Sequence, residues 1–249
     1  MFEPITLVTG ASRGIGAATA LALARVGHTV VVNYARDAQA AAQVVQRIHA
    51  DGGQALALQA DVAQEAQVLA MFEQIDAQVG RLTGLVNNAG VVDVAARVQD
   101  MSVARLKRMF DINVIGAFLC AREAVRRMST ECGGSGGAIV NVSSAATRIG
   151  SPGQYVDYAA AKGAVDVMTV GLAREVAACG IRVNAVRPGL IDTEIHASGG
   201  LPHRVRDLAH LVPMQRGGTA EEVAQAIVWL LSPQASYTTM ALVDVSGGR

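Results

Sequence analysis

The 249-residue sequence predicts one α/β domain, a doubly wound sheet of seven parallel strands with helices on both faces. Short β-branched runs alternate with long helical patterns from end to end, which is typical of this class. Runs such as VVV and AIVNV are too continuously apolar to have one face in water. No internal repeat, low-complexity tract or long linker divides the chain, so residues 1–249 are predicted to form a single domain.

The first half of the chain is expected to alternate regularly between the two kinds of element. Strand-like runs rich in apolar and β-branched residues cover 5–9, 29–34, 55–60 and 84–88. Helical patterns fill the connections at about 14–26, from about 38, and at 64–79. Each strand is therefore followed by a crossover of helical length, as parallel neighbours require.

The second half continues the alternation with longer helices. Helical patterns cover about 102–129, the alanine-rich run near 154–166, and 219–231. Strands are expected at 138–144, 181–188 and 241–245. The run CGGSGG at 132–137 is expected to be a flexible loop, and 190–215 is the one long stretch without a clear pattern.

Composition and charge exclude several classes of function. The chain is 51% hydrophobic and 17% charged, and its 21 Lys and Arg balance 21 Asp and Glu, so no long-range field draws it to nucleic acid or membrane. Cys120, Cys132 and Cys179 form no CxxC pair and the histidines show no ligand spacing, so neither disulfides nor a metal site are expected. The N-terminus lacks signal-peptide features, and no apolar run approaches the ~20 residues of a membrane span. We expect a cytoplasmic protein.

A glycine-rich turn, TGASRGIG at 9–16, lies between the first strand and the first helix. Its spacing departs from G-x-G-x-x-G but shares its logic, because glycines permit tight turning and close approach of a pyrophosphate, which the N–H groups at the helix start then face. The position favours dinucleotide binding over a plain connector. The candidate contacts in this turn are Gly10, Ser12, Arg13, Gly14, Ile15 and Gly16.

The end of the second strand bears on the choice of dinucleotide. An acidic residue there is typical of NAD binding, but this strand ends in Asn33 and Tyr34, with Arg36 two residues on. Arg36 and Arg13 together could hold a 2′-phosphate through charge-assisted contacts, so NADP(H) is favoured over NAD(H). Asp37 is nearby, and NAD(H) stays open as the alternative.

Two further strand ends carry cofactor candidates. Asp61 and Val62 follow the third strand at the carboxyl edge, where adenine is expected; an aspartate that caps the next helix is the alternative. The run NNAG at 87–90 follows the fourth strand at the same edge, where open α/β sheets bind ligands. Its two amides are otherwise turn formers.

The run QYVDYAAAKGAVD at 154–166 contains two tyrosines and a lysine. Tyr158 and Lys162 are four residues apart and share a helix face, whereas Tyr155 is two turns from the lysine. A phenol with a pKa near ~10 exchanges protons poorly at neutral pH, and an adjacent ammonium lowers that pKa toward the range suited to acid–base catalysis. The spacing favours Tyr158, but this pair alone leaves a structural tyrosine–lysine contact open.

Ser143 and Ser144 lie where the fifth strand ends, shortly before that helix. A serine hydroxyl there could hydrogen-bond a substrate oxygen beside the tyrosine. Three groups would then converge where a nicotinamide would sit. The alternative is that both serines only end the strand.

Several ordered motifs resemble the short-chain dehydrogenase/reductase family across essentially the whole chain, namely TGASRGIG, NNAG, DINVIG, VSS, YAAAK and RPG. The resemblance implies a seven-stranded Rossmann fold and a carbonyl–alcohol oxidoreductase that uses a nicotinamide cofactor. It implies Tyr158 as general acid/base, with Lys162 lowering its pKa and binding the nicotinamide ribose. Ser144 would orient the substrate oxygen, and Asn113 would hold a water in a proton relay to Lys162. By the same resemblance the cofactor cleft is lined by Asn87, Ala89, Gly90, Pro188, Gly189 and Thr193.

The chain departs in three places from bacterial 3-oxoacyl carrier-protein reductases, which it otherwise resembles. Ser144 and Tyr158 are 14 positions apart, one more than in many of those enzymes. Arg187 stands before Pro-Gly where a small residue is common. Met240 stands where many relatives have glycine.

The family places a mobile substrate lid over 190–215, with Gly199 and Gly200 as candidate hinges here. Four basic side chains of this segment could meet a polar or anionic substrate, namely His196, His203, Arg204 and Arg206. A solvated amphipathic helix is the alternative.

The helices around MFDINVIGAFLC and 163–173 are apolar over most of their circumference and need cover on more than one side. Family likeness favours homotetramers built on them, against burial inside the monomer.

The leading hypothesis is an NADP(H)-dependent reductase of a ketone or 3-oxoacyl thioester. The second is a sugar or polyol dehydrogenase that resembles glucose 1-dehydrogenase. The third is a non-catalytic NADP(H)-binding sensor, which would have no need of the proton relay. We expect a small-molecule substrate and neither nucleic acid nor membrane as a partner.

Overall fold

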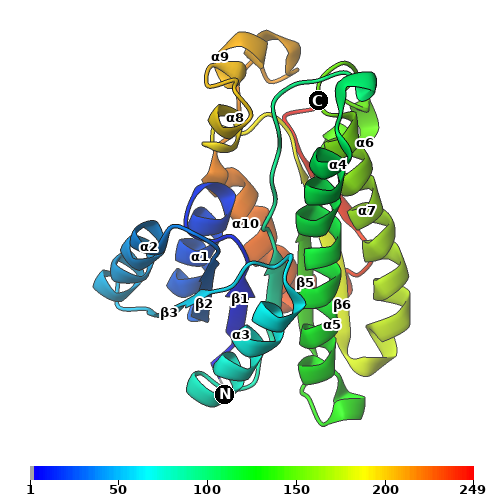
Figure 1. The fold of residues 1–249 in the computed structure, drawn as a ribbon. Coiled ribbons are helices and arrows are strands. Elements are labelled where there is room, and N and C mark those ends of the chain that lie inside the picture. The colour runs from blue at the N-terminus through cyan, green and yellow to red at the C-terminus, as the bar shows by residue number, and fades with distance from the viewer. Residues whose placement is uncertain (1–2) are drawn as a thin grey trace.

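The computed structural model describes residues 3–249, apart from the side chains of residues 196 and 198. Its centre is one sheet of seven parallel strands in the order β3-β2-β1-β4-β5-β6-β7 (Figure 1). The strands are β1 (Ile5–Val8), β2 (Thr29–Tyr34), β3 (Gln54–Gln59), β4 (Gly84–Asn87), β5 (Gly137–Val142), β6 (Ile181–Pro188) and β7 (Leu242–Val245). The strand order reverses between β1 and β4, which is where open α/β sheets bind their ligands. The predicted fold class is confirmed.

Helices cover both faces of the sheet (Figure 1). One face carries α1 (Gly14–Arg25), α2 (Ala38–Ala50) and α10 (Ala220–Leu231), and the other carries α3 (Glu65–Gln78), α5 (Gly116–Met128) and α7 (Val156–Val176). The shorter helices are α4 (Val103–Phe110), α6 (Ala146–Ile149), α8 (Ile195–Ser198) and α9 (Arg204–Leu208). Single 3-10 turns are η1 (Val98–Asp100), η3 (Thr130–Cys132), η4 (Ala177–Cys179), η5 (Ala209–Leu211) and η6 (Pro233–Ala235).

Two apolar cores lie on the two sides of the sheet. In β2, Val31 packs into the core beneath α3, α5 and α7, while Val30 and Val32 pack into the core beneath α1, α2 and α10. Successive side chains of a strand point to opposite faces, so a strand buried on both sides is apolar at every position. This explains the uninterrupted apolar runs of the sequence.

The long helix predicted over 102–129 is interrupted by a wider turn. Residues of η2 (Asp111–Ile115) form a π-helical turn between α4 and α5. Within it, the Asn113 side chain donates from Nδ2 to the Met109 carbonyl at 3.0 Å, so that carbonyl stays satisfied where the turn widens. Such π turns occur frequently at functional sites.

The segment 190–215 crosses the carboxyl ends of the strands and carries α8, α9 and η5 (Figure 1). The start of this segment is joined to the loop before α10 by an isolated β-bridge between Ile191 and Gly218. Among residues 3–249, no helix combines the length and the apolar character that a membrane crossing requires.

Candidate functional site

A cleft of about 160 Å³ opens at the carboxyl edge of the sheet, beside the point where the strand order reverses. Loops after four strands and one face of α7 contribute its walls. Its lining includes Ile15, Asn88, Gly90, Ser143, Ser144, Tyr158, Lys162, Pro188, Gly189 and Thr193. The cleft therefore gathers residues from the glycine turn, NNAG, VSS, YAAAK and RPG.

The glycine turn after β1 packs against the loop after β4 with no room for side chains. Gly10 has a φ of +61°, and a Cβ there would lie 2.9 Å from the Ala89 Cα. A Cβ on Gly16 would lie 2.5 Å from the Asn88 Nδ2. Both positions therefore require glycine, one for its conformation and one for the close approach.

The N-terminus of α1, next to this turn, has no cap of its own. Its N-cap residue, Arg13, makes no side-chain cap, and no acidic residue lies in its first turn. By contrast, α2, α4 and α10 are each capped by a side chain. The open N–H groups and the positive end of the helix dipole suit a pyrophosphate, so the turn fits the phosphates of a dinucleotide.

Two of the predicted cofactor-binding side chains are buried and hydrogen-bonded to other groups of the protein. Asn33 is 1% exposed; its Oδ1 accepts from the Gly10 N–H at 3.1 Å, and its Nδ2 donates to the Leu58 and Ala60 carbonyls. Asn87 is also buried and donates to the carbonyl of Ala117 and to Asn141 Oδ1. A polar side chain buried at a strand end must find such partners, so these two asparagines position loops rather than face the cleft.

Asp61 and Val62 likewise serve the fold. The Asp61 carboxylate accepts from the Ala63 N–H at 3.0 Å, which is a local turn in the loop before α3 and not the helix cap that the sequence left as the alternative. Val62 is buried, and a Cβ on Gly116 would lie 2.7 Å from its Cγ2. The backbone at 61–62 therefore stays a candidate adenine contact, whereas both side chains pack locally.

Thr9 and Asn88, which sequence reasoning missed, hold the two loops together. The Thr9 hydroxyl oxygen accepts from the N–H groups of Asn88 and Ala89 at 3.0 and 2.9 Å. Asn88 donates from Nδ2 to the Thr9 and Gly10 carbonyls at 2.8 and 3.1 Å. The doubled asparagine of NNAG is the signal that could have pointed here, but the sequence does not say which of the two faces the cleft.

Tyr158 and Lys162 face the same side of α7, with the Lys162 Nζ 5.7 Å from the centre of the Tyr158 ring. Lys162 is 4% exposed and donates from Nζ to the Val142 carbonyl at 2.7 Å. Ser144 and Tyr158 both line the cleft, and the Ser144 hydroxyl is close enough to lower the pKa of Tyr158. The structure thus brings Ser144, Tyr158 and Lys162 to one wall of the cleft.

Burial dominates the proton affinities of this pair. It raises the pKa of Tyr158 above its usual value, while the hydrogen bond from Ser144 lowers it in part. Burial also lowers the pKa of Lys162 to about 8, and the nearby Asp166 carboxylate opposes that change. Burial is the larger of the two effects on the Tyr158 pKa, and the lowering of that pKa by Lys162 stays a prediction.

Ser143 and Asn113 lie just behind this wall. The Ser143 hydroxyl donates to the Lys162 carbonyl at 3.3 Å, so Ser144 is the serine that meets Tyr158. Asn113 is buried, and its Oδ1 accepts from the Val91 N–H at 3.2 Å. A Cβ on Gly90 would lie 2.7 Å from Asn113 Oδ1 and 3.4 Å from Lys162 Nζ, so both groups lie against the same glycine.

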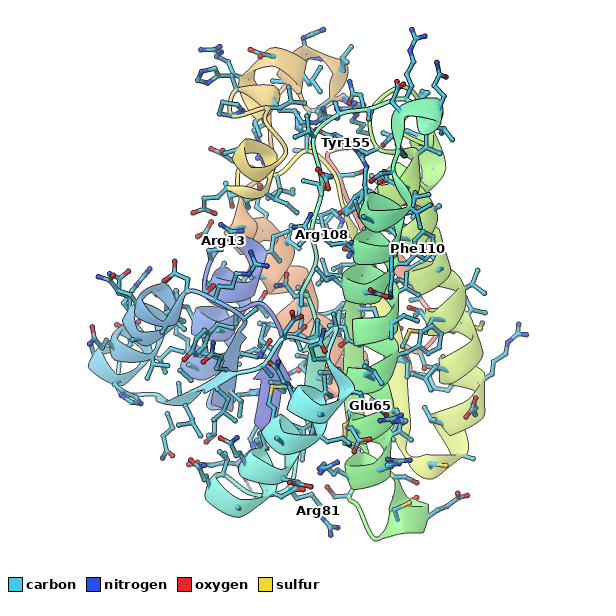
Figure 2. All side chains as sticks on the ribbon, in the orientation of Figure 1. Arg13, Glu65, Arg81, Arg108, Phe110 and Tyr155 are labelled. Atoms are coloured by element: carbon cyan, nitrogen blue, oxygen red, sulfur yellow. The ribbon has the colours of Figure 1, made fainter. Side chains whose placement is uncertain are left out.

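Arg13 and Arg36 are exposed, and neither forms an ion pair within residues 3–249. Arg13 lies near the start of α1 (Figure 2). The Asp37 carboxylate accepts from the Ala40 N–H at 2.9 Å and caps α2. Thr193 lies beside the glycine turn, since a Cβ on Gly14 would be 3.4 Å from its Cγ2.

The basic side chains of 190–215 separate into two groups. Arg204 lines the cleft and donates to Gln154 Oε1 at 2.8 Å. Arg206 pairs with Asp207 on the exposed side of α9, and His203 is exposed. The side chain of His196 falls outside the part of the chain that the structure describes.

Comparisons with known proteins agree with this geometry. Residues 10–249 match the family model described as enoyl-(acyl carrier protein) reductase. The chain is 59% identical over 245 residues to the uncharacterized oxidoreductase YgfF of Escherichia coli, covering 98% of this chain and 99% of that one. It is 40% identical over 245 residues to a 3-oxoacyl-[acyl-carrier-protein] reductase of Synechocystis, covering 98% and 96%.

A solved structure shares the whole fold. A Serratia marcescens short-chain dehydrogenase/reductase variant matches with a TM-score of 0.89 and 35% identity, over 98% of this chain and 97% of that one. Together with the family model and the relatives, this confirms the resemblance that the motifs indicate. The chain belongs to the short-chain dehydrogenase/reductase family of oxidoreductases.

Proposed function

We propose that the protein is an NADP(H)-dependent enzyme that interconverts a carbonyl and a secondary alcohol, with reduction of a ketone or 3-oxoacyl compound as its main direction. The observation that carries the proposal is the convergence of Ser144, Tyr158 and Lys162 on one wall of the cleft. The similarity to a 3-oxoacyl-[acyl-carrier-protein] reductase supports it.

The cofactor is proposed to bind across the glycine turn after β1 and along the loops after β4 and β6. When bound, it supplies or accepts the hydride. The uncapped start of α1 supports phosphate binding, and the engagement of Asp37 as the cap of α2 supports NADP(H) over NAD(H). Arg13 and Arg36 would hold the 2′-phosphate, because their exposed guanidiniums have no carboxylate partner within residues 3–249.

In the reducing direction, Tyr158 donates the proton to the carbonyl oxygen while the carbonyl carbon receives the hydride, which yields the alcohol. Ser144 orients that oxygen. Burial keeps the Tyr158 hydroxyl protonated, which suits a proton donor, and the Lys162 ammonium stabilises the phenolate left after transfer. Asn113 is assigned to the relay that returns a proton by way of Lys162, since both lie against Gly90.

The segment 190–215 is proposed to be the substrate lid. Gly200 has a φ of +80° and open space around its Cα, which suits a hinge, whereas Gly199 packs against Val92 and Tyr155. We also propose that the protein is cytoplasmic and that it forms a homotetramer.

The function is tested with a panel of ketones, 3-oxoacyl thioesters, sugars and secondary alcohols, followed by the absorbance of the reduced nicotinamide. Carbonyl-dependent oxidation of NADPH is the expected result. Turnover of sugars alone would favour the polyol dehydrogenase hypothesis. Tight NADPH binding without turnover of any compound would favour a sensor and overturn the proposal.

The cofactor preference is tested by combining Arg13→Ala with Arg36→Ala. Loss of two charge-assisted contacts should weaken NADPH binding by about tenfold to a hundredfold and NADH binding far less. Arg25→Ala is the matched control, because Arg25 is an exposed arginine at the opposite end of α1 that pairs with Asp51. Equal weakening of both cofactors would count against a 2′-phosphate site.

A further inference from the structure

The part of the cleft beneath 190–215 contains two guanidiniums and no aspartate or glutamate side chain. Arg204 and Arg249 both line it, and none of the described residues that line the cleft is an aspartate or a glutamate. The C-terminal end of the chain reaches this place beside α6 (Figure 1), where Arg148 donates to a main-chain carboxylate oxygen of Arg249. The cleft thus has a positively charged wall in addition to Lys162.

Arg204 is held in position by neutral groups. Its guanidinium donates to Gln154 Oε1 at 2.8 Å and lies 5.3 Å from the centre of the Tyr155 ring. Tyr155 is buried beneath the lid segment, at the start of α7 (Figure 2). Burial and the neighbouring charge of Arg249 both lower the pKa of Arg204. Arg204 also lines the cleft, so its guanidinium is placed to meet a ligand there.

Other arginines nearby have acidic partners. Arg148 pairs with Asp244 and Arg206 with Asp207, whereas neither Arg204 nor Arg249 forms an ion pair within residues 3–249. Two like charges that are half-buried together raise the free energy of the folded protein, and an anion between them offsets that cost. A guanidinium fork matches the oxygens of a carboxylate or phosphate.

We propose that the substrate carries an anionic group that binds Arg204 and Arg249 while its carbonyl faces Ser144 and Tyr158. Ile149 and Ile195 line the same part of the cleft and suit a short carbon chain between the two polar ends. The inference rests on the proposed function and names its substrate class, a small oxo acid or a phosphorylated ketone.

The experiment compares matched charged and neutral carbonyl compounds. One pair is 3-oxobutanoate and its methyl ester, and the other is dihydroxyacetone phosphate and dihydroxyacetone. For at least one pair, kcat/KM of the charged member should exceed that of the neutral one by about tenfold or more. The pair that responds identifies the anion as carboxylate or phosphate.

Variants connect this preference to the two arginines. Arg204→Gln should raise KM for the charged compound by about tenfold or more and leave the neutral compound within about twofold, and Arg249→Gln should act in the same direction. Arg206→Gln is the matched control, because Arg206 lies two residues away with its side chain 75% exposed. Equal kcat/KM within both pairs, or an equal loss for both members in Arg204→Gln, would overturn the proposal.

A binding measurement separates this proposal from the proposed function. With saturating NADP⁺ present, the charged compounds should raise the unfolding temperature of the wild-type protein more than the neutral ones, and Arg204→Gln should abolish the difference. If the anions bind through Arg204 but no carbonyl is reduced, the proposed function fails and the anion site stands. If carbonyls are reduced without any preference for charge, the anion site fails and the function stands.

Discussion

Met240 holds a backbone conformation that favours glycine. Its φ is +66°, and its N–H donates to the Val183 carbonyl at 2.7 Å, which ties the chain before β7 to β6. A side chain in this left-handed region has its Cβ too close to the neighbouring carbonyl oxygen. Many relatives have glycine where this chain has Met240, and the left-handed backbone gives a conformational reason for that glycine.

Replacing Met240 with glycine should relieve that strain. Met240→Gly is expected to be more stable to urea than Met240→Ala by about 1 kcal/mol, because alanine also removes the methionine side chain but keeps the strained Cβ. The two midpoints of unfolding give the comparison. Equal stability of the two variants, or a more stable alanine variant, would contradict the strain.

The buried Lys162 makes stability depend on pH. Its pKa is about 8 in the folded protein against 10.5 for an unperturbed lysine, so the unfolded chain binds more protons between these values. The free energy of unfolding therefore rises with pH through that window. Below the window, the folded protein bears the full cost of burying the charged Lys162 ammonium. The wild-type protein should gain on the order of 1–2 kcal/mol relative to Lys162→Met between about pH 7 and about pH 9.5.

The measurement is urea unfolding of both proteins at the two pH values. Lys107→Met serves as the control, because the Lys107 side chain is 73% exposed and should show no such difference. A gap between wild type and Lys162→Met that does not change with pH would show that the ammonium is not desolvated as the structure implies.

At the scale of elements, an ion pair joins β6 to the helix that carries Tyr158. Arg187 donates from Nε and Nη2 to one oxygen of Asp166, at 3.0 and 2.8 Å, and the other carboxylate oxygen has no partner among the residues that the structure describes. Asp166 lies one turn after Lys162 and is buried. Arg187, the second departure from related reductases, therefore has a packing role behind the wall of the cleft that carries Tyr158 and Lys162.

Removing only the arginine should be costly. Arg187→Met leaves a buried carboxylate unpaired and should lower the free energy of unfolding by on the order of 3 kcal/mol. Adding Asp166→Leu should recover most of that loss, because an apolar pair replaces the ion pair without an orphaned charge. Urea unfolding of the two variants tests this, and a double variant no more stable than the single one would refute it.

The first departure, the extra residue between Ser144 and Tyr158, lies in a tight loop at the mouth of the cleft. Ser151 has a φ of +47°, between Gly150 at +67° and Gly153 at +71°. The Tyr155 N–H donates to the Ser151 carbonyl at 3.1 Å. The loop accommodates its length by left-handed turns and leads directly into the start of α7.

Elements were predictable from the sequence because their signals are local. The run 181–188 coincides with β6, and the other strands shift by at most two residues at an end. The π turn at 111–115 was not predictable, since it depends on side-chain bonds from Asn113 to carbonyls in two segments. A pattern of apolar residues contains no information about such bonds.

Within the site, the spacing of four residues on one helix predicted that Tyr158 and Lys162 share a face. The sequence did not predict which way adjacent polar side chains point. Asn87 turns into the protein and Asn88 toward the glycine turn, because β4 ends between them and each finds different partners. Asn33 is buried because its side chain bonds to the glycine turn and to carbonyls at the end of β3. Such choices depend on neighbouring strands that are distant in sequence.

At the scale of the molecule, apolar side chains stay exposed along the outer side of α4, η2, α5 and α7. Val103, Ile115, Phe118 and Val167 are among them, and Phe110 lies on the outer side of α4 (Figure 2). A Cβ on Gly163 or Gly171 would meet nothing within 4 Å, so another helix could approach α7 closely. An exposed apolar face of this extent supports the proposed homotetramer.

Charges on this face should dissociate the assembly. Phe118→Glu combined with Val167→Glu places carboxylates on side chains that are 49% and 74% exposed in the single chain, so the monomer should keep its circular dichroism spectrum. Light scattering after size exclusion should show a tetramer for the wild type and a smaller species for the variant. Val26→Glu, on an exposed valine after α1, is the control. A monomeric wild type, or an unchanged mass for the variant, would contradict the proposed interface.

The central claim is that the Tyr158 hydroxyl exchanges the proton of the reaction, and a comparison of two phenylalanine variants tests it most directly. Tyr158→Phe should bind NADPH as the wild type does and lose carbonyl turnover by about a hundredfold or more. Tyr155→Phe, three residues away at the helix start, should keep turnover within about tenfold. Undiminished turnover in Tyr158→Phe would contradict the claim.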